Sequence, residues 1–273
     1  MLSHRNKTEE YAMTSSSAHS VSKMTLDDGT STLIANEDVK FPAKNDGLQA
    51  ELESGHQVPI GLISEYCQHD HVIRFDLQPL LMSWSGLDIV VSKPEPDGSM
   101  KKKVSRKDLQ PFYIAGKKLI SATISDSDHK QIYSLHAKWT SLHTHYYAKD
   151  NQGDKVLTLR GEKICRFNLT ATFKNAASGR NEDKTLLLKT GMSTKVSELR
   201  EDSGRLLALI ERPSKAKMCL PNEPFRVSIA PKVDTSLVMA ICLGMHTQLL
   251  TFKIGTYYAP SSAAAAVSAA SSS

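Results

Sequence analysis

The chain has 273 residues, enough for one or two domains, and its 40% hydrophobic content is enough for one sizeable core. The formal net charge is +5, but residues 1–57 carry only five of the 34 basic groups and nine of the 29 acidic ones, which leaves 29 basic and 20 acidic groups in residues 58–273. A basic folded part that follows an acidic leader is compatible with an anionic partner, but the charge alone does not identify that partner.

The cysteine pattern and the start of the chain favour an intracellular, cytoplasmic protein. The polar start Met1–Thr14 has no apolar stretch of the kind that signal peptides carry. The one candidate for a membrane span, Leu237–Ile254, is interrupted by polar residues, whereas a helix needs ~20 apolar residues to cross a bilayer. We therefore expect no transmembrane span and, at most, peripheral membrane association. Four scattered cysteines form no C-x-x-C pair and are expected to be reduced thiols: Cys67, Cys165, Cys219 and Cys242.

Composition divides the chain into three parts. Residues 1–57 are rich in Ser, Thr, Asp and Glu and have too few large apolar groups to offset the entropy of ordering, so they are predicted to be a disordered acidic leader. Residues 259–273 are rich in Ala and Ser and are predicted to be a disordered tail. Residues 58–258 are left as the folded domain.

Short runs suited to β-strands recur between polar turns in the first part of this domain. Pro79 marks a break after the first run. The turn residues Asp128, Gly153, Gly179 and Gly204 follow one another at intervals of 25, 26 and 25 residues, which favours successive hairpins in an antiparallel meander or barrel. The runs are Val72–Leu77, Leu87–Val91, Lys118–Ile124, Gln131–Leu135, Lys155–Leu159, Thr185–Leu188 and Leu206–Ile210.

A single helix is expected late in the chain. The strand Phe225–Ile229 is followed by Pro231, which cannot continue a central strand, and by Asp234, whose carboxylate suits a helix N-cap. Gly244 is placed as a helix stop, and Leu249–Ile254 is expected to form a last strand. The helix is apolar on nearly every side, so other parts of the protein must enclose it. The residues of this helix that are predicted to lie in the core are Leu237, Val238, Met239, Ala240, Ile241, Cys242 and Leu243.

Several of these stretches resemble one known family. Ser203–Arg212 and Phe225–Leu243 are similar to the end of the LURP-one-related family, which closes with a strand, an Ala-Pro-x-Val-Asp turn and an apolar helix. Leu142–Leu157 resembles the middle hairpin of that family, and Ala171–Gly179 resembles the next hairpin, especially in fungal members. Pro59–Leu62 fits the start, so the resemblance covers about residues 58–245.

This resemblance implies a tubby C-terminal-like fold: a mainly β, closed antiparallel barrel of about 12 strands wrapped around a buried C-terminal α-helix. It implies no reaction. Related branches include tubby domains, which bind phosphoinositide headgroups, and phospholipid scramblases. The chain departs from the family at Gly244–Gln248, where members usually have an acidic segment, and at Pro221–Pro224. No match to the Lys-x-Arg phosphoinositide motif of tubby domains is present, so no binding residue is carried over from it.

One cluster of basic residues is the candidate site for an anionic ligand. A polybasic segment gains about 1 kcal/mol per residue near an anionic lipid surface. The alternatives are a solvated loop between hairpins and nucleic-acid binding, for which the only nearby aromatics are Phe112 and Tyr113. The candidate residues are Lys101, Lys102, Lys103, Arg106, Lys107, Lys117 and Lys118.

Two other motifs have competing structural interpretations. His143 and His145 would lie on one strand face and could share a metal, but no ligand set completes the pair, and packing among Trp139, Tyr146 and Tyr147 is the competing interpretation. Asp126-x-Asp128 is expected to be a plain turn. We expect no catalytic residues, no metal and no cofactor.

The sequence therefore predicts a non-enzymatic tubby-like binding or regulatory module, with anionic phospholipid (phosphoinositide) surfaces as the candidate ligand. A phospholipid scramblase-like protein is the first alternative. A protein-interaction or structural module without a lipid ligand is the second.

Overall fold

A computed structural model describes residues 46–55, 57–83, 86–94, 113–118, 121–138, 145–161, 168–190, 195–212 and 224–258, all within one compact unit. Strands dominate this part of the chain, and one long helix follows them. The predicted mainly β, antiparallel fold with a C-terminal helix is confirmed.

The helical elements are α1 (Asp46–Glu53), the short 3-10 helices η1 (Ser64–Cys67) and η2 (Ala176–Ser178), and α2 (Thr235–Tyr258). The first six strands are β1 (Ile73–Ser83), β2 (Gly86–Ser92), β3 (Tyr113–Lys118), β4 (Ser121–Asp126), β5 (Gln131–Lys138) and β6 (His145–Lys149). The other six are β7 (Lys155–Gly161), β8 (Leu169–Asn175), β9 (Glu182–Lys189), β10 (Val196–Glu201), β11 (Leu206–Glu211) and β12 (Phe225–Ile229).

Hydrogen-bonded pairs join the twelve strands in the order β1-β12-β11-β10-β9-β8-β7-β6-β5-β4-β3-β2. Strand β1 pairs with β2 through Leu77↔Val91 and with β12 through Phe75↔Val227, both antiparallel. The strands at the two ends of this order, β1 and β2, also pair with each other, so the order returns to its start, as in a closed barrel. Such an order leaves no strand as an open edge.

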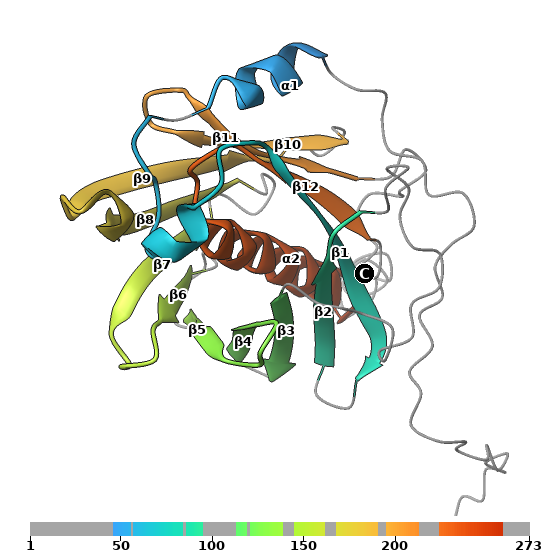
Figure 1. Cartoon of the computed structure of the whole chain (residues 1–273). Helices are drawn as coiled ribbons and strands as arrows, with labels where there is room; N and C mark the ends of the chain where they lie inside the picture. The colour runs from blue at the N-terminus through green and yellow to red at the C-terminus, as the bar shows by residue number, and fades with distance from the viewer. Residues whose placement is uncertain are drawn as a thin grey trace, which may run out of the picture. The chain divides into compact units, whose positions relative to one another are not determined.

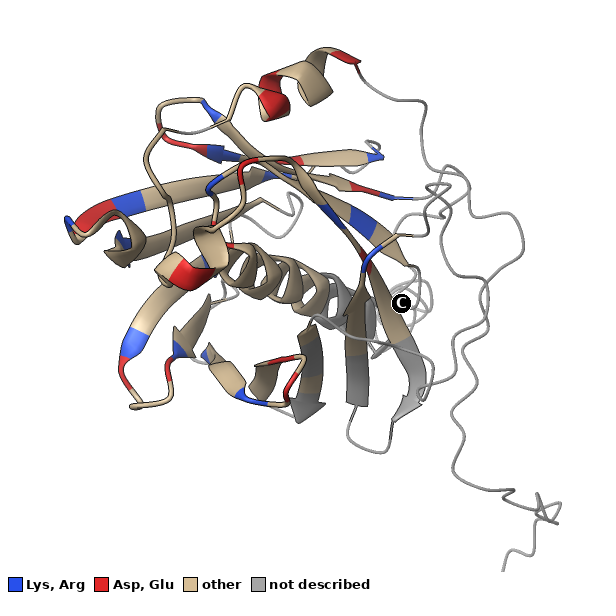
Figure 2. Cartoon of the chain, in the orientation of Figure 1, with Lys and Arg blue, Asp and Glu red and all other residues tan. Residues whose placement is uncertain are grey.

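Helix α2 runs through the ring of strands (Figure 1). The seven residues expected to form its core, 237–243, are all buried, and none is more than 3% exposed. Buried and less buried residues alternate along several strands, as in β6, where Tyr146 and Ala148 are buried, whereas every residue of β12 is buried. No charged residue occurs between Thr235 and Gln248, and this stretch of α2 is tan in Figure 2.

Four hairpins meet at one end of the sheet, called here the turn end. They are the β4–β5, β6–β7, β8–β9 and β10–β11 connections. The predicted turns are confirmed, and Gly153, Gly179 and Gly204 have φ values of 89°, 75° and 89°, where a side chain would be strained. Strand β12 also finishes at the turn end, so α2 enters the ring there.

The expected end of the helix is wrong. Gly244 does not stop α2, and Leu249–Ile254 is helical and not a strand. A Cβ atom on Gly244 would lie 2.5 Å from Leu159 Cδ1, so glycine at this position lets the helix approach β7 closely. This close approach explains a glycine inside the helix, where it otherwise costs about 1 kcal/mol relative to alanine.

Two strand boundaries also differ from the sequence prediction. Pro79 does not break β1, because Pro79 pairs with Ile89 of β2 while the β1–β12 pairing reaches only Leu77. Proline has no N–H to donate, and at this position β12 makes no backbone hydrogen bonds with β1, so no hydrogen bond is lost. The run Lys118–Ile124 is not one strand: Lys118 pairs with Ser121 across a hairpin between β3 and β4.

Helix α1 lies inside the segment predicted to be a disordered leader. Its Leu52 is fully buried, and the helix packs against β11, so the ordered part of the chain begins before residue 58. Leu48 and Leu52 supply apolar contacts that the low average hydrophobicity of the leader conceals. Residues 1–45 and the tail 259–273 lie outside the described residues, so those predictions stand as predictions.

Candidate functional site

The segment Pro59–Ile63, called here the strap, crosses the turn end of the sheet. Ile60 N–H donates to the carbonyl of Lys232 at 3.0 Å, and Asp234 N–H donates to the carbonyl of Ile60 at 2.8 Å. These bonds form a parallel bridge between the strap and the turn that joins β12 to α2. The start of the domain is thus tied to the start of its central helix.

The Asp234 carboxylate fastens the strap and caps α2 at the same time. Its Oδ1 accepts from the N–H and hydroxyl of Ser236 and from the N–H of Leu237, at 2.6–3.1 Å, which confirms the predicted N-cap. Its Oδ2 accepts from the N–H groups of Leu62 and Ile63, each at 2.9 Å. Burial raises the pKa of this carboxyl, and the hydrogen bonds oppose the shift.

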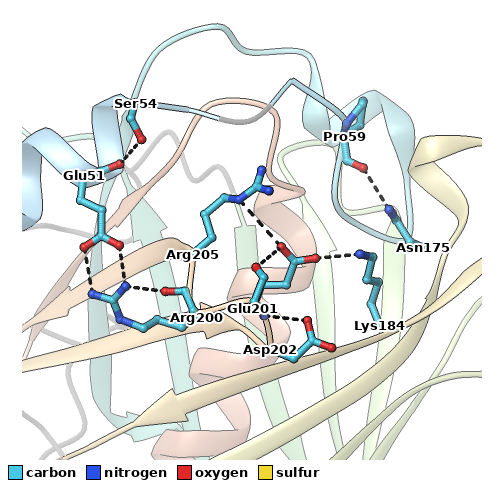
Figure 3. A network of polar contacts seen from close by, with 11 residues as sticks. Glu51, Ser54, Pro59, Asn175, Lys184, Arg200, Glu201, Asp202 and Arg205 are labelled. Carbon is cyan, nitrogen blue, oxygen red and sulfur yellow. Dashed lines mark hydrogen bonds and ion pairs between the residues drawn. The ribbon is translucent and has the colours of Figure 1, made fainter.

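Asn175, at the end of β8, holds the other side of the strap. Its Oδ1 accepts from Gly61 N–H at 2.9 Å, and its Nδ2 donates to the carbonyl of Pro59 at 3.1 Å, the contact drawn in Figure 3. Ala177 N–H donates to the carbonyl of Gly61. The strap is therefore fixed between β8 and α2.

Charged pairs join the elements beside the strap, as Figure 3 shows. Lys184 of β9 bonds Glu201 of β10 at 2.7 Å, and the Glu201 carboxylate is only 5% exposed. Arg200 of β10 binds both carboxylate oxygens of Glu51, the Nη2–Oε2 distance being 2.9 Å, and so attaches α1 to the sheet. The pKa of Glu51 is lowered chiefly by this hydrogen bonding to Arg200.

A pocket of about 750 Å³ opens at the turn end, between η1 and the hairpins of β5 to β9. Its apolar lining comes from the strap, η1 and four neighbouring strands or turns. This combination of an apolar lining and a few charged side chains is typical of small-molecule sites. The apolar lining residues are Leu62, Ile63, Tyr66, Ile132, Tyr133, Val156, Leu157, Phe173 and Ala176.

Three lysines on successive hairpins line the same pocket: Lys130, Lys155 and Lys174. All three are exposed, and none makes an ion pair with any residue that the structure describes. The fourth lining lysine, Lys184, is already bonded to Glu201. The arrangement can attract an anionic group to the rim of an apolar pocket.

The basic residues singled out from the sequence are mostly beyond what the structure describes. Lys101, Lys102, Lys103, Arg106 and Lys107 lie outside the described residues. Lys117 and Lys118 are on β3, which begins at the turn end with Tyr113 and finishes at the opposite end. Their strand positions therefore lie at the far end from the pocket.

The histidine and aspartate candidates have structural surroundings. His143 and Trp139 lie outside the described residues, and the described residues contain no group of three metal-ligating side chains. His136 stacks on Tyr147, with ring centroids 5.2 Å apart. Asp126 accepts from the N–H groups of Asp128 and Lys130, so the expected plain turn is confirmed.

The rim lysines were not identified from the sequence. Each lies within a few residues of a hairpin turn: Lys130 follows the Asp126 turn, Lys155 follows Gly153, and Lys174 precedes Gly179. The repeat of turns was visible, and a basic residue two positions after Asp128 and Gly153 and five positions before Gly179 was the signal that would have found the rim. Their convergence depends on how the hairpins pack side by side.

Two further findings bear on membranes and on thiol chemistry. Across the residues described, no helix combines the length and the apolar character that a bilayer crossing requires.

Burial raises the pKa of the Cys67 and Cys242 thiols to about 12, so both are poor nucleophiles at neutral pH.

Comparisons with known proteins found a matching family and similar solved structures. The crystal structure of an Arabidopsis thaliana protein is similar, with 14% sequence identity, coverage of 67% of this chain and 94% of that chain, and a TM-score of 0.31. No curated protein matches the sequence. The LURP-one-related family model matches residues 77–246, which is more than half of the chain and includes the Ala-Pro-x-Val-Asp turn and the first half of α2. The expected membership is confirmed: the chain belongs to the LURP-one-related family.

Proposed function

We propose that this protein is a non-enzymatic binding module that associates with anionic phospholipid surfaces, phosphoinositide-containing ones included. The observation that carries the proposal is the set of exposed lysines Lys130, Lys155 and Lys174 around one pocket at the turn end. Each exposed lysine near an anionic leaflet contributes about 1 kcal/mol. In this proposal the protein is cytoplasmic and reaches the membrane only peripherally.

Chain connectivity supports a role for the basic segment Lys101–Lys107 at the same end. Strand β2 finishes at Ser92 and β3 begins at Tyr113, both at the turn end. Lys107 is six residues from Tyr113, so its Cα atom is at most about 21 Å from that of Tyr113. We propose that this segment adds to the positive field of the rim lysines.

The interior of the sheet supports binding over catalysis. It is filled by α2 and by apolar side chains, and the buried hydroxyls of Tyr113 and Tyr133 bond to Thr235 and Ser236 at the start of α2. These polar groups are used to hold the helix. The proposed activity therefore belongs to the outer rim and the pocket.

Co-sedimentation of the full chain with vesicles tests the proposal. We expect binding to vesicles containing anionic lipid, little binding to phosphatidylcholine vesicles, and loss of binding as salt shortens the screening length from about 10 Å at 0.1 M to about 3 Å at 1 M. At about 1 kcal/mol per lysine, the triple variant K130Q/K155Q/K174Q should bind on the order of a hundredfold more weakly at low salt. Neutralising Lys101–Lys103 in a separate variant tests the basic segment.

The matched control is K138Q/K189Q/K195Q, which also removes three exposed lysines. Lys138 and Lys189 end β5 and β9 at the far end of the sheet from the pocket, and Lys195 precedes β10 at that same end. Equal loss in both variants would point to net charge alone and would contradict a site at the turn end. If no vesicle pellets the protein while pull-downs recover partners, the protein-interaction alternative replaces this proposal. Lipid transfer between leaflets in reconstituted vesicles would favour the scramblase-like alternative.

A further inference from the structure

We infer that the turn-end pocket holds one acyl chain of an anionic amphiphile, with its head at the rim lysines; this inference rests on the proposed function and specifies its ligand. The source of the chain can be a free fatty acid or a membrane lipid, because both present an apolar chain joined to an anionic head. Vesicle binding alone needs only exposed charge, whereas this inference requires the apolar pocket to be occupied.

The apolar part of the argument rests on size and lining. The pocket volume of about 750 Å³ lies within the range of roughly 300–1,000 Å³ that ligand sites occupy. Val156 and Tyr66 line it and are only half-buried, so apolar surface remains for a ligand to cover. Phe173 and Leu157 belong to the packed core and give the pocket a rigid wall.

The head group is identified by the charges that remain available at the rim. Lys184 is bonded to Glu201, and the Asp150 carboxylate accepts from the N–H groups of Gln152 and Asp154 within its own turn. The other charged lining residues are the three rim lysines, with Glu65 and Asp183 opposing them. With Asp150 counted, three carboxylates balance the three rim lysines, so the anionic head is assigned to these lysines because they are the exposed cations at the rim and not because of a net charge.

Calorimetric titration of the full chain with three probes tests the inference. Decanoate has both the chain and the anionic head, decanol has the chain alone, and acetate has the head alone. We expect decanoate to bind with one-to-one stoichiometry, decanol to bind on the order of tenfold more weakly because exposed ionic contacts are lost, and acetate to give no saturable binding. Absence of one-to-one decanoate binding would overturn the inference.

Two variants separate the chain from the head. Val156→Trp adds bulk inside the pocket and should abolish decanoate binding while binding to anionic vesicles persists. K130Q/K155Q/K174Q should remove the preference for decanoate over decanol. Unchanged decanoate affinity in Val156→Trp would overturn the inference while leaving the proposed function intact, and loss of vesicle binding with decanoate binding intact would reject surface association only.

Cross-linking keeps the test informative if Val156→Trp does not fold. A decanoate analogue with a photoactivatable diazirine at the chain end, bound to the unmodified full chain, should label residues 62–66, 130–133, 155–158 or 172–176. Mass spectrometry locates the adduct. Labelling confined to other peptides would overturn the inference.

Discussion

Gly61 lies directly against Asp234: a Cβ atom on residue 61 would overlap the Cβ, Cγ and Oδ2 atoms of Asp234. The absence of a side chain lets the strap come close enough for Leu62 and Ile63 to donate their N–H groups to Oδ2. One glycine therefore allows a buried carboxylate to cap α2 and bind a segment more than 170 residues earlier in the chain.

Gly61→Ala should lower the free energy of unfolding by about 3 kcal/mol, because the added methyl group clashes and moves two donors away from a buried carboxylate. Urea unfolding measures this loss. Gly153→Ala is the control: a Cβ atom there meets nothing within 4 Å, and its φ of 89° makes the substitution cost about 1 kcal/mol. Equal losses in the two variants would show that the contact with Asp234 is unimportant.

Gly244→Ala should destabilise the protein by about 1–2 kcal/mol even though alanine favours helix by about 1 kcal/mol, because its Cβ atom would collide with Leu159 Cδ1. In a Leu159→Val background, which removes that methyl group, the same substitution should be neutral or stabilising. Denaturant unfolding of the four proteins gives the coupling free energy, expected at about 2 kcal/mol. Additive effects would exclude a direct contact.

Ala240→Asp should prevent folding, because residue 240 is fully buried in the second turn of α2 and the new carboxylate would have no partner. Circular dichroism and soluble yield measure the outcome. Ala176→Asp places the same charge at an exposed position of η2 and should fold normally. A cooperatively folded Ala240→Asp protein would contradict the enclosure of α2 by the sheet.

Acid should weaken the attachment of α1 to the sheet. Hydrogen bonds from Arg200 lower the pKa of Glu51, so its contribution to stability is complete above the ordinary glutamate pKa and is lost as pH falls through the lowered value. Because the Glu51 side chain is 38% exposed, we expect a change of about 1 kcal/mol or less. Hydrogen-exchange protection factors of α1 between pH 6 and about pH 3 measure the effect.

Glu51→Gln should show reduced protection of α1 at neutral pH and no further loss in acid. Glu53→Gln, on the same helix, serves as the control, because the Glu53 carboxylate accepts from Gln49 and makes no ion pair with any residue that the structure describes. Protection that falls equally with pH in wild type and Glu51→Gln would assign the acid response to another group.

The sequence by itself determined the features that depend on neighbouring residues. The turns at Gly153, Gly179 and Gly204 follow from backbone freedom, and the Asp234 cap follows from the free amides of the next turn. Residues 237–243 are apolar on nearly every side of the helix. The sequence therefore showed that this helix must be enclosed by protein, because it offers no polar side to water. Each of these properties is set within a few residues of the chain.

The role of Gly244, the ordering of α1 and the position of the rim lysines were decided by the tertiary structure alone. Each of these features depends on contacts between residues far apart in sequence. Gly244 reads locally as a helix stop, and only Leu159 on the facing strand shows that it is a contact point. Helix α1 is ordered by Arg200 and by burial of Leu52, neither of which the composition of the leader reveals. Likewise, Lys130, Lys155 and Lys174 surround one pocket only because three hairpins pack side by side at the same end of the sheet.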